Sequence, residues 1–522
     1  MKTLVSLLLL GLSFVTSADC TFRFASYYGD HMVLQQQPAR AVVWGYGEPG
    51  AELTVSLEPG LEPGLGPGSL TISKTAVTIN DEGVWKLMLP AMGYGGPYHL
   101  VAQQFTTNTT TIYLKDILFG DVWLCSGQSN MEMTVSQMFN ASEELKMASD
   151  YPYIRLFAAS LEQSDVELQD LIKVDLQWSL PSAGTLGQGN FTYFSAVCWV
   201  FGRHLAHRLK YPIGLVESSY SGTPVEAWSS KTALKKCGLS NAADNSYSFN
   251  FFDMMVASSS MYSVLWNAMI HPLINMTIKG AIWYQGEQNT EINTDLYNCT
   301  FPTLISDWRR RFHEGSLGQT DPIFPFGFVQ LSTYQKAKQK DNYPVIRWHQ
   351  TADFGYTPNS KMPNTFMAVT MDLGDEKSPY GSVHPRDKGT VGYRLYLGAR
   401  AIAYGEKEVQ FQGPFPVRID VYYEYLYMNI TYDQKLLMTG TCDNMFEVYC
   451  STDKGKSYKW VPVPASYLVI SPKRVTISFD GCPDAQGVRY AWNDWPCEYK
   501  RCSLYSVQKK LPAPLFVKYF AT

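Results

Sequence analysis

The pattern of hydrophobic and polar positions changes along the chain and divides it into regions of different texture. From residue 20 to about 115, short apolar or alternating runs at 22–26, 41–46, 85–89 and 98–102 are separated by Gly and Pro. Such runs are typical of strands joined by turns. We predict a small β-sandwich that leads without a long linker into the next region.

From about residue 116 to 405, strand signals and helix signals alternate. Short apolar runs predict buried strands, and apolar positions at helical spacing predict helices. The predicted strands lie at 213–216, 281–284, 323–331 and 365–370, and the predicted helices at 196–209, 264–270, 303–312 and 390–404. This alternation is typical of a layered α/β fold.

From about residue 410 onwards the strand pattern returns. The predicted strands lie at 418–423, 426–431, 474–478 and 488–492. We interpret this part as a second β module. The expected domains are a signal peptide at 1–18, an N-terminal β-sandwich at 19–115, an α/β domain at 116–408 and a C-terminal β domain at 409–522.

The N-terminus reads as a secretory signal. Lys2 precedes an apolar run at 4–15, and the small residues at 16–18 suit cleavage. No later run reaches the roughly 18 apolar residues that a membrane span needs. We expect a mature chain in the secretory pathway, with the sequence leaving lysosomal and secreted fates open.

Cysteine usage and glycosylation sequons agree with that compartment. The ten Cys are even in number, and five of them follow residue 440, so we predict disulfides in the C-terminal region. Their spacing is unlike a zinc site, and no metal is expected. Asn-x-Ser/Thr sequons predict glycans on surface loops at Asn108, Asn140, Asn190, Asn275, Asn298 and Asn429.

Composition narrows the partners. The net charge of −4 and the 17% of charged residues give no electrostatic argument for nucleic acid or an anionic membrane surface. The 13 Trp and 34 Tyr suit β-rich cores, and they also suit stacking on sugar rings.

The stretch 118–131 (LFGDVWLCSGQSNM) carries the first candidate for chemistry. An apolar strand-like run at 122–124 leads into a glycine turn that can open a helix. A residue in such a turn lies at the carboxyl edge of a sheet beside unpaired N–H groups. Ser129 occupies the position of a nucleophile, although the same residues also fit a polar turn with a helix cap.

A serine nucleophile needs a base, and the chain has eight His. His384 lies in a Gly/Pro-bounded loop between the strand at 365–370 and the helix at 390–404. Because such a loop meets the same sheet edge as Ser129, His384 is the preferred candidate. His271 and His349 fit that edge less clearly, and a hydrogen-bonded loop histidine is the alternative for His384.

Two more predicted strands end in polar glycine turns. Gly222 follows the strand at 213–216, and Gln285 follows the strand at 281–284. A backbone N–H at Gly222 and an amide side chain at Gln285 could stabilise an oxyanion. Each turn is common by itself, and the prediction depends on their occurring together in one domain.

Four motif blocks occur in order: Gly-Gln-Ser-Asn-Met at 127–131, Gly-Thr-Pro-Val-Glu-Ala-Trp at 222–228, Trp-Tyr-Gln-Gly-Glu at 283–287 and His-Pro at 384–385. They resemble the blocks of SGNH-type carbohydrate acetylesterases, and 22–26, 32–35 and 495–499 extend the match to enzymes specific for sialic acids. The resemblance implies a flavodoxin-like α/β/α hydrolase domain, flanked by β-sandwich modules, that removes acetyl groups from the 9- and 4-hydroxyls of sialic acids without a cofactor. It implies Ser129 as nucleophile and His384 as base, with the oxyanion held by the Ser129 N–H, the Gly222 N–H and the Gln285 side chain.

The sequence departs from that pattern at one position. Many SGNH enzymes place Asp three residues before the His, where this chain has Gly381. Asp387 is the best replacement as the acid that orients His384, and Asp372, Asp375 and Glu287 are others. Alternatively, a backbone carbonyl orients His384 in a Ser–His dyad, an arrangement that we favour.

The residues that recognise the substrate are harder to identify. A sialic acid carries a carboxylate, whose natural partner is a bidentate Arg. Arg347 and Arg386 lie near candidate loops, although both could be solvated charges. Two other functions stay open: an acetylesterase acting on other polysaccharides, and a secreted carbohydrate-binding protein without activity. The sequence does not address the oligomeric state.

Overall fold

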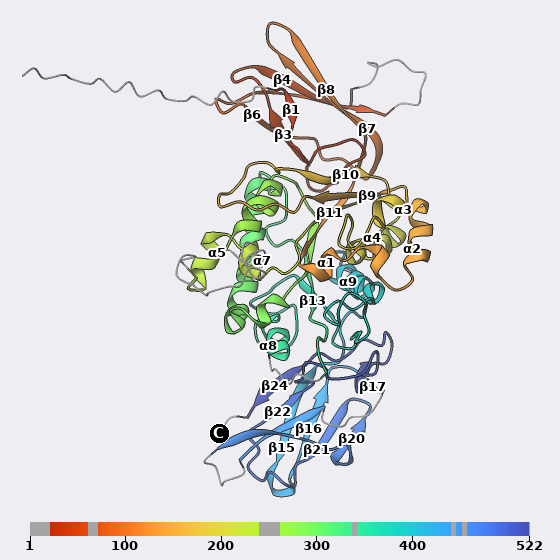
Figure 1. Ribbon diagram of the computed structural model, residues 1–522, viewed down its shortest axis with the longest axis vertical. Helices are drawn as coiled ribbons and strands as arrows, with labels where there is room; N and C mark the ends of the chain where they lie inside the picture. Colours follow the sequence, from red (N-terminus) through yellow and green to blue (C-terminus); the bar gives the residue numbers. More distant parts are fainter. Residues whose placement is uncertain are drawn as a thin grey trace, which may run out of the picture.

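The computed structural model describes residues 21–60, 71–239, 262–336, 342–439, 445–451 and 457–520. The predicted signal peptide lies outside these residues. In Figure 1 the strands of the N-terminal region, the mixed α/β region and the strands of the C-terminal region follow one another along the long axis. Among the described residues, no helix is long and apolar enough to cross a membrane.

The N-terminal region is built from β-strands, as predicted. One sheet contains β1, β3 and β6, and β4 pairs with β5 and β7 in a second. The strands are β1 (Arg23–Phe24), β2 (Val33–Gln35), β3 (Val42–Tyr46), β4 (Glu52–Pro59), β5 (Ser73–Thr78), β6 (Val84–Met88) and β7 (Gly95–Phe105).

One long strand, β8 (Thr109–Gly127), joins this region to the next. Its first half pairs antiparallel with β7, and its second half pairs parallel with β11 (Ile213–Ser219) and β12 (Gly280–Tyr284). The prediction that no long linker separates the two regions is therefore confirmed, because a single strand belongs to both.

The central sheet has the strand order β10-β9-β11-β8-β12-β13-β14. Its remaining strands are β9 (Ile154–Ala159), β10 (Val174–Ser179), β13 (Phe326–Gln330) and β14 (Thr365–Val369). All neighbours from β9 to β14 pair in parallel, and β10 is an antiparallel edge. Every residue of β9 and β11 to β14 is buried, which explains why these strands read as continuous apolar runs.

The helices of the central region are α1 (Ser129–Glu132), α2 (Ala141–Met147), α3 (Ala183–Leu186), α4 (Ala196–Leu209), α5 (Lys231–Lys236), α7 (Tyr297–Gly315), α8 (Asn342–His349) and α9 (Lys388–Ile402). The helix predicted at 196–209 is confirmed as α4, which packs against α9. The residues predicted as a helix at 264–270 include a π-helical turn at Trp266–Ile270. Two disulfides cross-link elements of this region. Cys125–Cys198 joins β8 to α4, and Cys237–Cys299 joins the end of α5 to α7.

The C-terminal region also consists of strands, as predicted (Figure 1). The sheets are β15-β16-β21-β20, β19-β18-β22-β24 and the pair β17-β23. Their bounds are β15 (Pro416–Tyr422), β16 (Tyr427–Tyr432), β17 (Leu436–Met438), β18 (Phe446–Ser451), β19 (Tyr458–Pro462), β20 (Leu468–Ser471), β21 (Arg474–Ser478), β22 (Gly487–Tyr490), β23 (Leu504–Ser506) and β24 (Phe516–Tyr519). The predicted disulfides are present as Cys450–Cys482 and Cys497–Cys502.

The sequons occupy different kinds of structure. Asn108, Asn140 and Asn190 are exposed outside helices and strands, and Asn275 is half-buried in a loop. Asn298, however, lies in α7, and Asn429 lies in β16. The prediction that every sequon lies in a surface loop is wrong for Asn298 and Asn429. Each of them belongs to a regular element, the packed helix α7 or the paired strand β16.

Candidate active site

Ser129 is the first residue of α1, immediately after the carboxyl end of β8. Gly127 has φ +143°, and a Cβ there would lie 2.2 Å from the carbonyl oxygen of Tyr284, so only glycine fits. The next residue, Gln128, donates its N–H to that same carbonyl at 2.9 Å. The strand continues through Gly127, slightly further than predicted, and the turn is held against β12.

The structure brings Ser129 and His384 together, although they are far apart in the sequence. His384 Nε2 lies 2.8 Å from Ser129 Oγ, and His384 Nδ1 lies 2.7 Å from the carbonyl oxygen of Tyr380. A carbonyl oxygen only accepts hydrogen bonds, so Nδ1 carries the proton in the neutral ring. Nε2 is then free to accept the proton of the Ser129 hydroxyl.

The loop that carries His384 is held by its own hydrogen bonds. The N–H of His384 donates to the carbonyl of Gly381 at 2.9 Å, and Ser378 Oγ donates to the carbonyl of His384 at 2.6 Å. Gly381 itself has φ +89°, which favours glycine. The residue that replaces the usual acid therefore shapes the turn instead of orienting the imidazole.

The carboxylates considered for that orienting role have other partners. Asp387 accepts from Thr390 as the N-cap of α9, and from Tyr499 and Lys500. The remaining pairs are Asp372–Arg394, Asp375–Arg386 and Glu287–Asn130. The assignment of Asp387 as the orienting acid is not supported, and the backbone carbonyl of the dyad arrangement occupies that place.

His384 is mostly buried, and its environment favours the neutral ring. Burial lowers the pKa of His384 below its ordinary 6.5, the hydrogen bond to Tyr380 partly offsets this, and the positive charge of Lys388 lowers it further. A neutral imidazole is the form that can accept a proton. The ring edge of His384 also contacts Phe191, with centroids 5.4 Å apart.

Gly222 lies in the loop after β11, beside α1. The N–H of Tyr220 donates to the carbonyl oxygen of Gly127, and Ser221 Oγ donates to Glu132 Oε2 at 2.6 Å. Gly222 has φ +70°, and a Cβ there would meet no atom within 4 Å. Its N–H donates to no partner among the described residues. This placement suits the predicted oxyanion donor.

Gln285 is placed differently from the prediction. Its side chain is fully buried, and Nε2 donates to the carbonyl of Thr223 at 3.1 Å and to Asn289 Oδ1 at 2.7 Å. The carbonyl oxygen of the amide accepts from Tyr297 at 2.9 Å. Because both N–H groups already have partners, Gln285 has no donor left for an oxyanion. It fixes the residue that follows Gly222 instead.

A buried polar cluster beneath Ser129 and His384 was missed by sequence reasoning. Asn130 Nδ2 donates to the carbonyl of Val383 at 2.9 Å and to Glu287 Oε1 at 2.5 Å, and Asn130 Oδ1 accepts from Lys388 Nζ at 2.5 Å. Lys388 is fully buried, and burial lowers its pKa to about 7. Asn130 belongs to the motif block at 127–131, so the sequence marks its position. Its hydrogen-bond partners could not be predicted from the sequence.

The two predicted substrate arginines are already engaged. Arg347 is completely buried, and its guanidinium donates to the carbonyls of Leu331, Ser332, Asn493 and Asp494 at 2.7–2.8 Å. Its predicted role in substrate binding is therefore wrong, because it joins two parts of the chain. Arg386 is partly exposed but forms a bidentate pair with Asp375.

A cavity of about 300 Å³ lies beside α1. Glu132, at the end of α1, and Phe191, which contacts His384, line one part of it. Glu217 and Asp175 also line the cavity, and burial raises the pKa of Glu217 well above its ordinary value. Burial raises the pKa of Glu132 to about 7, and the hydrogen bond from Ser221 partly offsets this effect.

Comparison with known proteins agrees with this geometry. Residues 119–393 match the family described as "Carbohydrate esterase, sialic acid-specific acetylesterase", and residues 419–520 match the "Sialate O-acetylesterase C-terminal domain". The chain is 52% identical to the sialate O-acetylesterase of Homo sapiens over 507 residues, covering 96% of this chain and 94% of that protein. It is 50% identical to the Mus musculus sialate O-acetylesterase over 525 residues, with 96% and 95% covered.

A solved structure extends the similarity to the fold. The crystal structure of a carbohydrate acetylesterase from Xanthomonas citri matches with a TM-score of 0.76 and 27% identity, covering 95% of this chain and 99% of that one. Both β regions and the central region therefore lie within the matched span. The chain belongs to the sialate O-acetylesterase family.

Proposed function

We propose that this protein is a serine esterase that hydrolyses O-acetyl esters of sialic acids and releases acetate. The observation that carries the proposal is the 2.8 Å contact between Ser129 Oγ and His384 Nε2, with Nδ1 fixed by the Tyr380 carbonyl. A nucleophile within hydrogen-bond reach of an oriented base is the geometry that acyl transfer needs.

In the first half-reaction, Ser129 Oγ attacks the acetyl carbonyl carbon while its proton moves to His384 Nε2. The sugar oxygen leaves as the tetrahedral intermediate collapses, and it takes that proton from His384, so an acetyl-serine remains. The Tyr380 carbonyl supports the imidazolium through the proton on Nδ1. A carbonyl dipole stabilises that charge less than a full carboxylate would.

The negative charge on the acetyl oxygen needs donors during both half-reactions. The N–H of Ser129, at the start of α1, has no preceding helical turn to bond, and the N–H of Gly222 has no hydrogen-bond partner among the described residues. We assign these two groups to the oxyanion and give Gln285 the task of holding Thr223. In the second half-reaction, His384 activates water, which releases acetate from Ser129.

The cavity beside α1 is our candidate for the acetylated part of the sugar. The carboxyl oxygens of Glu132 and Glu217 can accept hydrogen bonds from sugar hydroxyls, and above about pH 7 the charged Glu132 disfavours the sialate carboxylate in the same space. We therefore place the substrate carboxylate outside the cavity. The 9-O and 4-O acetyl groups of the sialic acid are the proposed targets, and the residues that line the cavity include no Lys or Arg to pair with the sialate carboxylate.

We propose several further properties of this esterase. They are an SGNH-type three-layer hydrolase domain, the domain boundaries given above, signal cleavage near residue 18, glycans at the six sequons and a lysosomal or secreted location. The central parallel sheet and the disulfides support the first and the last of these.

The direct test is acetate release from 9-O-acetyl and 4-O-acetyl sialic acids by the wild type, Ser129→Ala and His384→Ala. We expect activity only in the wild type, together with fluorophosphonate labelling at Ser129. Acetylated xylan, assayed in parallel, tests the polysaccharide alternative. Faster release from xylan would overturn the substrate assignment, and absence of labelling would favour a carbohydrate-binding protein.

A further inference from the structure

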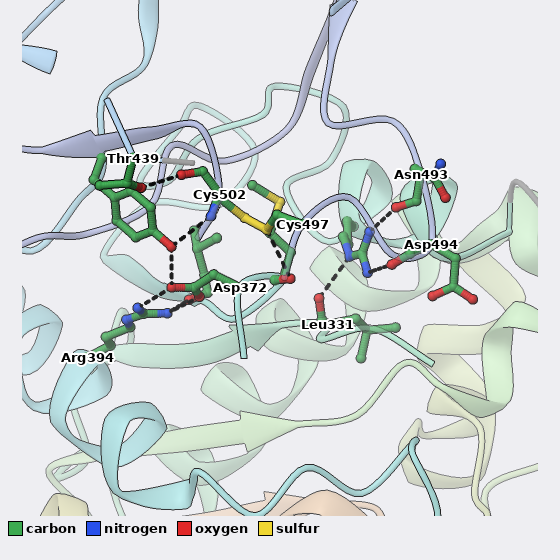
Figure 2. The surroundings of a disulfide bond; sticks show 12 residues. Leu331, Asp372, Arg394, Thr439, Asn493, Asp494, Cys497 and Cys502 are labelled. Atoms are coloured by element: carbon green, nitrogen blue, oxygen red, sulfur yellow. Dashed lines mark hydrogen bonds and ion pairs between the residues drawn. A yellow bond between two sulfur atoms is a disulfide. The ribbon is translucent and has the colours of Figure 1, made fainter. Parts of the chain in front are cut away.

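A short ring of the C-terminal region, closed by the disulfide Cys497–Cys502, lies against the loop that carries His384. Figure 2 shows this disulfide beside Asp372, which Arg394 of α9 contacts from the other side. The His384 loop begins after β14 (Thr365–Val369) and ends where α9 begins at Lys388. The ring belongs to a part of the chain that supplies no residue to the Ser129–His384 pair.

The ring holds the start of the His384 loop through Asp372. The N–H of Lys500 donates to the carbonyl of Asp372 at 2.7 Å. Tyr505, just after the ring, donates its hydroxyl to Asp372 Oδ2 at 3.1 Å and accepts the N–H of Cys502 at 3.2 Å. Arg394 completes the site with bonds of 2.6 and 2.8 Å to the two carboxylate oxygens. Asp372 is fully buried and fixed by several elements at once.

The same ring holds the end of the loop through Asp387. The hydroxyl of Tyr499 donates to Asp387 Oδ2 at 2.6 Å, and Lys500 Nζ lies 2.8 Å from the same oxygen. Asp387 also caps α9 by accepting the N–H of Thr390 at 2.9 Å. Burial alone would raise the pKa of Asp387, but the hydrogen bonds from Lys500 and Tyr499 bring it below its ordinary value.

Asp387 follows His384 by three residues, so a shift at the helix cap moves the imidazole. We propose that the ring at 497–502 positions His384 for catalysis by fixing both ends of its loop, with Tyr499 and Lys500 as positioning residues. This inference rests on the proposed esterase function. The C-terminal region thereby contributes to catalysis, although it lies far from Ser129 in the sequence.

The geometric requirement explains why such a clamp matters. Within the part of the chain that the structure describes, the hydrogen bond of His384 Nδ1 goes to the Tyr380 carbonyl and to no side chain, so the direction of the ring depends on where the loop backbone lies. A displacement of about 1 Å at a reacting group can cost about 10²-fold in rate. Substrate groups that bind away from His384 would be unaffected, so the loss should fall on kcat.

The test compares full-length Tyr499→Phe, Lys500→Met and the double variant with the wild type. We expect kcat for acetate release to fall about tenfold in each single variant and about 10²-fold in the double variant, with KM within about twofold. Lys500→Arg should restore most of the loss, because it keeps a cation beside Asp387. Tyr425→Phe, an exposed position in the same C-terminal region, is the matched control and should retain full kcat.

Hydrogen exchange of the amides in 373–387 provides a readout that needs no activity. Exchange should be faster in the double variant than in the wild type and unchanged in Tyr425→Phe. The proposal is overturned if the folded double variant keeps wild-type kcat, if only KM changes, or if exchange in 373–387 is unaltered. A wild type that releases no acetate would reject the esterase function itself, and exchange would still decide whether the ring fixes the loop.

Discussion

Asn130, the neighbour of Ser129, donates its side-chain amide to the carbonyl of Val383, the neighbour of His384, at 2.9 Å. A single side chain thus connects the start of α1, which carries the candidate nucleophile, to the loop that carries the candidate base. The oxygen of the same amide accepts from Lys388 Nζ, and its nitrogen also donates to Glu287 Oε1. The distance between Ser129 and His384 depends on this link as well as on the backbone.

Replacing Asn130 should therefore separate the catalytic pair without removing it. For Asn130→Ala we expect kcat to fall about 10²-fold with little change in KM, because the misplacement affects the reacting atoms and not the sugar contacts. Steady-state kinetics on O-acetyl sialic acid provide the measurement. The rate of fluorophosphonate labelling at Ser129 should fall in parallel, and unchanged labelling would contradict the assignment.

The pH dependence should reflect the lowered pKa of His384. The base must be neutral to accept the serine proton, so activity is lost as the pH falls through its pKa. Since burial lowers that pKa below 6.5, the acid limb of kcat/KM should have its midpoint below pH 6.5. A midpoint above 6.5 in the wild type would contradict the desolvated site.

Lys388→Met tests the source of part of that shift. The positive charge of Lys388 lowers the pKa of His384, so its removal should move the acid limb to higher pH. The variant also loses a bond to Asn130, and kcat at the optimum should decrease. The midpoint is the diagnostic quantity, and a limb that stays in place or moves to lower pH would show that Lys388 does not act on His384 electrostatically.

Asp387→Asn distinguishes a helix cap from an orienting acid. Loss of a true orienting acid can cost about 10⁴-fold in turnover. Here the asparagine keeps an oxygen for the cap but loses its charge pair with Lys500, and the structure predicts a loss of no more than about 10²-fold. Acetate release from the folded variant, measured beside His384→Ala, decides between the two roles.

Arg347→Met should affect stability and not substrate binding. Its guanidinium satisfies four backbone carbonyls in a fully buried position, and losing these bonds should cost about 3 kcal/mol or more of unfolding free energy. Denaturant unfolding measures this loss. Arg418→Met, at an exposed position of β15, is the matched control and should unfold like the wild type. If the Arg347→Met variant is as stable as the wild type but has a raised KM, the prediction that Arg347 binds substrate would be restored.

Glu132→Gln tests the acidic cavity. Since the pKa of Glu132 is raised to about 7, the side chain is charged above that pH and neutral below it. Removing the charge should lower KM for a sialate ester severalfold at pH 8 and have little effect at pH 5.5. A neutral acetylated sugar should show no such difference. Equal effects on both substrates would show that the charge of Glu132 does not repel the sialate carboxylate.

The sequence predicted the strands β11 to β14 and the helices α4, α7 and α9 because their signal is local burial. The run at 213–216 and the periodic pattern at 196–209 are apolar where β11 and α4 are buried. Boundaries were less accurate. The helix predicted at 390–404 begins at Lys388, because Asp387 caps it and takes further bonds from Tyr499 and Lys500.

By itself, the sequence predicted Ser129 and His384 as the candidate nucleophile and base. Ser129 and His384 follow predicted strands in glycine-rich motif blocks, and parallel strands bring their carboxyl ends to one edge. The tertiary structure decided how the other polar groups are used. Gln285 donates to Thr223 and Arg347 donates to Asp494, and both of these partners are distant in the sequence. The Tyr380 carbonyl, and not a carboxylate, accepts from His384 Nδ1. The sequence specifies the chemical type of each side chain. Whether its hydrogen-bond donors remain free depends on which partners folding places within about 3 Å.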